Sequence, residues 1–284
     1  MSSIPLTTPA AGYRLRLAAR PGTVLASIVV VLVVVAAVAP GLLTAGTPTQ
    51  IDLPNALAAP SWSHPFGTDE AGRDLLTRVI HGTQLSLGIG LGATGIAMAL
   101  AIVLGFVAAL AGGLVDTAIT RVLEVAFAFP ALLAALLVVV IYGPSVTTSI
   151  IAVGISSTPG YARMVRGQVL SVKQAGYIEA AHALGHRRWD VIRRHLLPNA
   201  MRPLVAVVTL GIGQSIVWAS SLAFLGLGVP PPSPEWGALL DAGRNYITTS
   251  WWLAILPGLV IVAFAIAVTT LGRSLQQRLE GAAR

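Results

Sequence analysis

The sequence has no cysteine and few charged residues. Without cysteine, disulfide cross-links, thiol catalysis and cysteine-ligated metal sites are excluded. Only 10% of the 284 residues are Asp, Glu, Lys or Arg, whereas soluble domains carry about 25%, so this chain cannot cover a surface that faces water on all sides. Hydrophobic residues make up 55% of the chain, and the mean hydropathy is +0.80. These values predict an integral membrane protein.

Six apolar segments are long enough to be transmembrane helices. They lie near 23–44, 85–112, 122–142, 145–161, 203–228 and 253–272. None shows the alternating pattern of barrel strands, so the sequence predicts an all-α integral membrane fold with six transmembrane helices. The segment 145–161 is the shortest and is rich in Ser and Thr, which suits a helix buried in a bundle.

The five longest of the stretches outside these segments carry most of the polar residues. They are the N-terminal tail 1–22, the loops 45–84, 162–202 and 229–252, and the C-terminal tail 274–284. The first apolar segment is longer than the core of a signal peptide, so we expect a retained anchor; cleavage near Ala39 is the alternative. No internal or inverted repeat is visible, and no soluble catalytic domain fits in the remaining stretches.

The basic residues predict how the chain is oriented in the membrane. With the N-terminus inside, 15 of the 18 Lys and Arg residues fall in inner stretches and 3 in outer ones. We therefore expect both termini to be cytoplasmic, with the loops 45–84 and 229–252 outside. Because this asymmetry accounts for the net charge of +7, we do not expect nucleic acid as a partner.

The inner loop 162–202 contains two helical stretches. Helix-favouring residues run from Tyr177 to Leu184, and Gly185 is suited to a left-handed helix end. A second stretch begins at Trp189, and we expect Pro198 to close it. The result is a helix–turn–helix on the cytoplasmic face with an apolar side and a basic side.

The spacing within this loop resembles a known family. Glu179-Ala180-Ala181 is followed after three residues by Gly185, and later by Leu197-Pro198. This pattern resembles the EAA loop of ABC-importer permeases, which reads E-A-A, three residues, G, nine residues, I, one residue, L-P. One position departs, because His195 stands where the family usually has Ile.

The resemblance implies a fold of the type I ABC-importer permease architecture and a role for this loop. In that family the loop forms a coupling helix that docks into a cleft on the ATPase subunit. The residues implied in ATPase coupling are Glu179, Ala180, Ala181, Leu184, Gly185, Leu197 and Pro198. Small alanines would allow close approach, and Glu179 could pair with an Arg of the partner. The alternative is an amphipathic loop that binds anionic lipid.

Two further groups of residues resemble the permease of dipeptide and oligopeptide importers known as the DppC/OppC type. They are His64-Pro65-Phe66-Gly67-Thr68-Asp69 with Gly72-Arg73-Asp74, and Phe224-Leu225-Gly226-Leu227-Gly228 with Pro234-Glu235-Trp236-Gly237 and Gly243-Arg244-Asn245-Tyr246. This resemblance implies a bacterial inner-membrane protein. It also implies three kinds of partner, which are a B-type permease, one or two ATPase subunits and an external solute-binding (lipo)protein.

No phosphate-binding loop of the form G-x-x-x-x-G-K-[ST] is present, so we expect a non-catalytic subunit whose ATP and magnesium are bound by partner chains. The interpretation is a permease subunit of an ATP-driven importer of di- or oligopeptides. Nickel chelates, haem or other small solutes are alternative cargoes. An ion-coupled secondary carrier is an alternative of another class, but ionisable residues within the membrane are nearly absent. Glu124 is the exception, and we expect it to pair locally with Arg121.

Several other residues admit two interpretations. Ser215, Trp218, Ser220 and Ser221 of the fifth segment are candidates for lining a polar pathway, and contacts between buried helices are an equally good explanation.

Gly88 and Gly92, with Gly95 and Gly105, predict close helix packing, either within this chain or against a partner permease. His64, Asp69, Glu70 and Asp74 fit no metal signature, and we expect capping bonds there instead. Asp74 and the residues after it predict a short amphipathic helix on the outer surface.

Overall fold

The structure is a computed structural model that describes residues 21–281, with side chains through Gln277. Within these residues it is helical and has no β-strand, only a single bridge between Thr68 and Asp74. The α-helices are α1 (Pro21–Val38), α2 (Leu75–Ala111), α3 (Gly113–Ala128), α4 (Ala131–Tyr142), α5 (Val146–Lys173), α6 (Gly176–Ala183), α7 (Arg188–Val191), α8 (Leu197–Met201), α9 (Leu204–Leu222), α10 (Trp236–Arg244) and α11 (Trp252–Gly281). Short 3₁₀ turns are η1 (Pro40–Leu42) and η2 (Leu53–Asn55), and π-helical turns are η3 (Ile192–Leu196) and η4 (Ala223–Leu227).

The all-helical membrane architecture predicted from the sequence is confirmed. Four helical segments are long and apolar enough to span a bilayer, namely α1, α2, α9 continued by η4, and α11. The pair α3 and α4 adds a fifth if it is counted as one bent span. The helix α5 has 28 residues and is more polar, and it packs inside the bundle against α2. The six transmembrane helices predicted from the sequence correspond to these four segments, the bent pair of α3 and α4, and α5.

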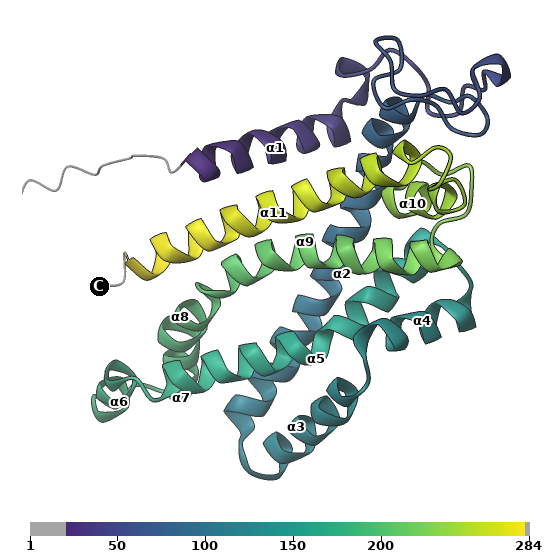
Figure 1. The fold of residues 1–284 in the computed structure, drawn as a ribbon. Coiled ribbons are helices and arrows are strands. Elements are labelled where there is room, and N and C mark those ends of the chain that lie inside the picture. The colour runs from purple at the N-terminus through teal and green to yellow at the C-terminus, as the bar shows by residue number, and fades with distance from the viewer. Residues whose placement is uncertain (1–20, 282–284) are drawn as a thin grey trace, which may run out of the picture.

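The helices form a layered bundle. In Figure 1, α1, α11, α9 and α5 run side by side, and α2 crosses them obliquely. The helix α2 has 37 residues, so its length of about 55 Å exceeds the roughly 30 Å hydrocarbon core. One end of the bundle carries α6, α7 and α8, and the opposite end carries α10 and the loop 45–74 (Figure 1). The predicted tail 1–22 lies almost wholly outside the described residues, as do 282–284.

The predicted single helix 122–142 is wrong. The chain bends by 85° between α3 and α4. Phe129 at the break is extended, with φ −77° and ψ 133°, because a residue before proline is disfavoured in the helical region. Pro130 then caps α4. The sequence stays apolar across this break, so its hydropathy pattern did not reveal the bend.

Helix boundaries differ from the predicted ones at several other points. The outer segment that begins at Asp74 is not a separate surface helix, because it continues directly into α2. The helix predicted at 145–161 extends to Lys173, and the helix predicted at 253–272 extends to Gly281. The first span ends at Val38 and not at 44, since Ala39 precedes a proline and leaves the helical region.

Small residues bring α2 and α5 together. A Cβ atom added at Gly105 would lie 2.9 Å from the carbonyl oxygen of Ala162, and one added at Gly154 would lie 3.1 Å from that of Ala93. Such a close approach of two backbones is how helices associate in lipid, where no hydrophobic effect drives them together. Gly92 also faces α5, against Ile150, whereas Gly95 faces open space. Part of the glycine pattern therefore serves packing within this chain.

The end of the bundle that carries α10 and the loop 45–74 is held by buried polar contacts. The carboxylate of Asp69 accepts hydrogen bonds from the backbone of Ala71 and Arg73 and from the guanidinium of Arg78. Arg78, which is buried, also donates to the carbonyl oxygens of Pro232 and Ser233 at 3.2 and 3.3 Å. This network joins the loop 45–74 to the loop before α10.

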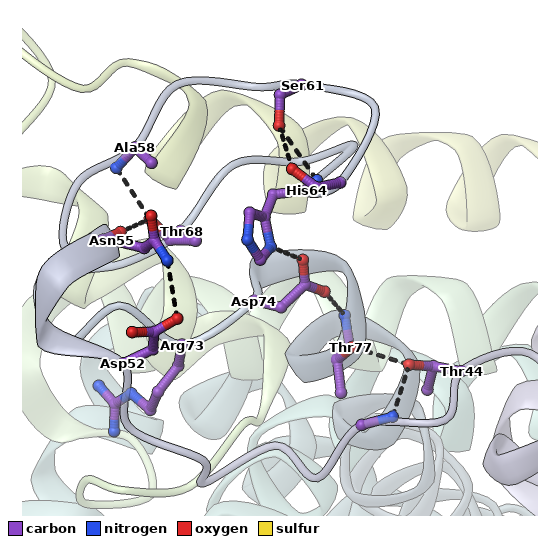
Figure 2. Close-up of polar contacts among 12 residues, drawn as sticks. Thr44, Asp52, Asn55, Ala58, Ser61, His64, Thr68, Arg73, Asp74 and Thr77 are labelled. Atoms are coloured by element: carbon purple, nitrogen blue, oxygen red, sulfur yellow. Dashed lines mark hydrogen bonds and ion pairs between the residues drawn. The ribbon is translucent and has the colours of Figure 1, made fainter.

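Neighbouring side chains complete the outer loop. Nδ1 of His64 lies 3.0 Å from Oδ2 of Asp74 (Figure 2). Oδ1 of Asp74 accepts a hydrogen bond from the backbone N–H of Thr77 at 2.7 Å. Thr68 accepts from the backbone of Ala58 at 2.8 Å. The prediction that capping bonds hold this loop is confirmed, since Asp69 and Asp74 both accept backbone N–H groups in this way.

Glu235 connects α10 to α2. Its carboxylate accepts from the N–H groups of Gly237 and Ala238 at 2.9 and 2.8 Å and from the hydroxyl of Ser86 at 3.1 Å. Burial raises the pKa of Glu235, while these donors act in the opposite direction. Trp236 is fully buried beside it and donates from Nε1 to the carbonyl of Val79 at 2.9 Å.

We expect Gly105→Ala to destabilise the protein by about 1–3 kcal/mol, because the added methyl group would overlap the α5 backbone. The matched variant Gly95→Ala meets no atom within 4 Å and should leave stability unchanged or slightly improved. Thermal unfolding of the purified protein in detergent compares the two. Equal melting temperatures would contradict the close crossing of α2 and α5.

Candidate functional site

The segment that carries the Glu179 motif is anchored to the bundle by apolar side chains. The helix α6 follows α5 after a two-residue connection. Ile178 is 2% exposed and Ala181 is also buried. Both belong to a core cluster that includes Val169 of α5 and Val191 of α7. Ala181 thus packs inside this chain, and its predicted close approach to a partner remains a prediction.

The other face of α6 is open. Glu179, Ala180 and Leu184 are exposed, Leu184 to 79%. Tyr177 is exposed beside them. Within the described part of the chain, Glu179 makes no ion pair and accepts no hydrogen bond through its side chain. An unpaired carboxylate surrounded by exposed apolar groups is suited to a protein partner, because such a surface is unfavourable in water.

Gly185 ends α6 as the sequence predicted. Its φ is +78°, in the left-handed region that favours glycine. Its N–H donates to the carbonyl of His182 at 3.0 Å, and the N–H of His186 donates to that of Ala181 at 3.2 Å. This pair of bonds is a Schellman motif. It turns the chain sharply at the tip of the segment.

The return from the tip runs through α7, η3 and α8. The prediction that Pro198 closes this stretch is wrong, since Pro198 lies in the first turn of α8 and the helical path continues. The N–H of Leu197 donates to the carbonyl of Ile192, five residues earlier. This wider turn accommodates a proline ring that would collide with the carbonyl four residues before it. His195, the position that departs from the EAA pattern, lies in this π-helical turn.

Leu197 and Pro198 are exposed, whereas Leu196 between the π turn and α8 is buried. Asn199 supports the turn, because its Nδ2 donates to the carbonyl of His195 at 2.6 Å. The predicted coupling residues therefore divide into an exposed set and the buried Ala181. The exposed members are Glu179, Ala180, Leu184, Gly185, Leu197 and Pro198.

Exposed arginines flank the tip. Arg187, Arg188, Arg193 and Arg194 have no acidic partner among the described residues. Trp189 is 68% exposed among them. The basic side predicted for this loop is present, and it lies beside the acidic and apolar face of α6.

Polar contacts tie the segment to the rest of the bundle. Lys173, at the end of α5, donates to the carbonyl of Ala109 in α2 at 3.2 Å. Arg166 of α5 holds Asp116 of α3 with two bonds of 2.6 Å. A force on α6 would therefore be passed to α2, α3 and α5 together.

The four candidates for a pathway lie in different environments. The hydroxyl of Ser215 lies 3.0 Å from that of Thr94, in a buried contact between α9 and α2. Trp218 is half-buried and packs on a cluster formed with α2, α4 and α5. Ser220 and Ser221 line an apolar groove of about 380 Å³ at the C-terminal end of α9. The predicted local pair of Arg121 and Glu124 is confirmed, at 2.9 Å.

Comparison with known proteins decides the family. Residues 101–281 match the sequence profile described as "Binding-protein-dependent transport system inner membrane component". The chain belongs to this family. The resemblance to an ABC-importer permease is therefore confirmed, and the chain is a non-catalytic membrane component of a binding-protein-dependent ABC importer. Membership implies, in general terms, a second permease, an ATPase and a binding protein as partners.

Related permeases are similar over most of their length. The probable D,D-dipeptide transport system permease protein DdpC of Escherichia coli is 36% identical over 260 residues, covering 92% of this chain and 87% of the relative. The dipeptide transport system permease protein DppC of Alkalihalophilus pseudofirmus is 36% identical, covering 89% and 83%. The glutathione transport system permease protein GsiD of Pectobacterium atrosepticum is 40% identical, covering 78% and 73%.

Solved structures support the fold of this permease. The MetNI methionine ABC transporter in an inward-facing conformation matches with a TM-score of 0.59 and 18% identity, covering 72% of this chain and 96% of that chain. An amino acid ABC transporter matches with a TM-score of 0.59 and 16% identity, covering 72% and 94%. At these identities the likeness concerns the fold alone.

Sequence reasoning missed the residues that anchor α6 to the bundle. Ile178 and Val191 are nearly fully buried, yet they belong to no motif and lie in short stretches of mixed character. The spacing of Ile178 and Ala181, three residues apart, was the available signal, because it places both side chains on one face of a helix.

We expect Ile178→Ala in this permease to loosen α6 by creating a cavity, at a cost of about 2–5 kcal/mol to the local structure. Hydrogen exchange of the α6 amides, followed by mass spectrometry, should become faster. The neighbouring variant Tyr177→Ala removes an exposed side chain and should leave exchange unchanged. Equal protection in both variants would show that α6 does not depend on this contact.

Proposed function

We propose that this chain is a permease subunit of an importer for di- or oligopeptides. It forms the translocation pathway together with a second, B-type permease. The relatives named for dipeptides, di/tripeptides and glutathione support peptides as cargo. An external solute-binding protein delivers the cargo, and one or two ATPase subunits supply the energy. Nickel chelates and haem are the rival cargoes.

The coupling proposal depends on the tip formed by α6 and Gly185. The exposed face of α6 enters a cleft of the ATPase, and Glu179 pairs with a cation of that partner. The buried face of α6, through Ile178 and Ala181, connects the tip to α5. Closure of the ATPase upon ATP binding then shifts the permease between two discrete states.

The orientation proposal places α6, α7 and α8 in the cytoplasm. These helices lie at one end of the bundle with the exposed arginines, and the loop 45–74 and α10 lie at the other (Figure 1). This distribution agrees with the excess of basic residues on the cytoplasmic side of membrane proteins. Both chain termini are then cytoplasmic.

We expect Glu179→Gln to lower cargo-stimulated ATP hydrolysis by about tenfold, because a charge-assisted hydrogen bond contributes roughly 1.5–3 kcal/mol. Gly185→Ala should have a similar effect, because it strains the left-handed turn. The measurement uses the assembled complex in liposomes with the binding protein and cargo.

Gly176→Ala is the matched control for Gly185→Ala. Gly176 opens α6, is exposed and meets no atom within 4 Å at its Cβ position. Recovery of all subunits on purification separates a loss of coupling from a loss of assembly. Full stimulation in the Glu179 and Gly185 variants would contradict the coupling role.

Reporter fusions test the orientation. A fluorescent protein, which folds in the cytoplasm, should be bright when inserted after Gly185, and alkaline phosphatase should be active when inserted after Ser61. The reverse pattern would overturn both the orientation and the ATPase contact.

A further inference from the structure

An apolar groove opens at the outer part of α9 and η4. Its walls come from five elements, with Leu132 from α4, Leu240 from α10, and Gly258 and Ile261 from α11. Ser220 and Phe224 form the side contributed by α9 and η4. The volume of about 380 Å³ is within the range of small-molecule pockets, about 300–1,000 Å³.

Ser220 provides a free hydrogen-bonding group in this apolar setting. The residue is 4% exposed, and its hydroxyl has no hydrogen-bond partner among the described residues. The adjacent Ser221 differs, because its hydroxyl donates to the carbonyl of Val217 at 2.8 Å. A buried polar group without a partner is unfavourable and calls for an explanation. A ligand that brings its own polar group would supply one.

Charged groups of both signs lie beside the groove. Arg244 of α10 donates to the carbonyl of Phe224 at 3.0 Å, and its guanidinium lies 5.7 Å from the centre of the Phe224 ring. Asp241 lies 3.4 Å from Arg244, and both side chains are partly exposed. A carboxylate and a guanidinium at one rim suit a ligand that carries an amine and a carboxylate.

We propose that this groove binds cargo peptide during translocation, which rests on the proposed function. An apolar side chain of the peptide fills the groove, a backbone amide of the peptide bonds the hydroxyl of Ser220, and the charged termini lie toward Asp241 and Arg244. A lipid acyl chain has no group to satisfy Ser220. A partner helix has its backbone groups already paired. An extended peptide has unpaired N–H and C=O groups along its length.

The first experiment changes the size of the groove in the assembled importer. Gly258→Leu places a side chain in the groove, and its Cβ atom meets only Leu240, at 3.5 Å. Uptake of Ala-Phe should fall about tenfold or more relative to uptake of Ala-Ala, because the pocket then rejects a large side chain. Both uptake rates are measured in the same variant, so their ratio does not change when activity falls for both peptides alike. An unchanged ratio would overturn the proposal.

The second experiment removes the hydroxyl. Ser220→Ala should lower the uptake of both peptides by about three- to tenfold, which is the loss of one hydrogen bond. The melting temperature should stay the same or rise, because the substitution breaks no bond within the protein. The control variant Thr209→Ala also removes a hydroxyl from α9, at a position outside the groove where the hydroxyl donates to the carbonyl of Val205 at 3.0 Å, and it should transport normally. Normal transport by Ser220→Ala would count against the amide contact.

The third experiment locates the cargo directly. A dipeptide that carries a benzoylphenylalanine side chain is irradiated during turnover, and the cross-linked residues are mapped by mass spectrometry. Adducts on α9, η4 or α11 support the site. Adducts only on other chains or other helices would overturn it, as would a tightly bound lipid that occupies the groove and is not displaced by peptide. If the wild-type complex takes up nickel chelates or haem and no peptide, the proposed function itself fails.

Discussion

The close crossing of α2 and α5 is the constraint on which the rest of the structure depends. In a bilayer the lipid tails are as apolar as the side chains, so helices associate through close packing. Here the backbone of α5 approaches that of α2 where Gly105 meets Ala162 and where Ala93 meets Gly154. The contacts lie along much of α5, which makes the two helices one rigid unit.

This unit extends to the end of the bundle that carries α6. Because α5 continues to Lys173 without a break, the tip formed by α6 is carried on the same helix that crosses α2. The breaks in the chain lie elsewhere. Gly112 and Gly113 both have positive φ between α2 and α3, and Phe129 is extended between α3 and α4. A displacement of α6 is therefore expected to move α5, α2 and, through the contact between Arg166 and Asp116, α3 together, and to be absorbed at the break between α3 and α4.

The sequence predicted local features well where backbone chemistry decides them. Gly185 ends a helix because its left-handed conformation favours glycine, and Asp74 caps a helix because its carboxylate accepts a backbone N–H. Prediction failed where contacts between distant parts of the chain determine the structure. The helix predicted after Asp74 was expected to be separate from the span near 85–112, yet both belong to the single helix α2. Ala180 and Ala181 look alike in the motif, but only the fold shows that one is exposed and the other buried.

The end of α2 near α10 positions the groove in the same way as its opposite end positions the tip formed by α6. Ser86 of α2 holds Glu235, and Glu235 caps α10. A Cβ atom added at Gly237, in the first turn of α10, would lie 2.8 Å from the Cα of Ser220, so α10 touches α9 at the residue that carries the free hydroxyl. Arg78, eight residues before Ser86, holds the loop that precedes α10. One helix therefore supports both the contacts that shape the groove and the crossing that carries the tip formed by α6, and a change at either end acts on a shared element. Reciprocal coupling between cargo and nucleotide requires such an element with two discrete positions.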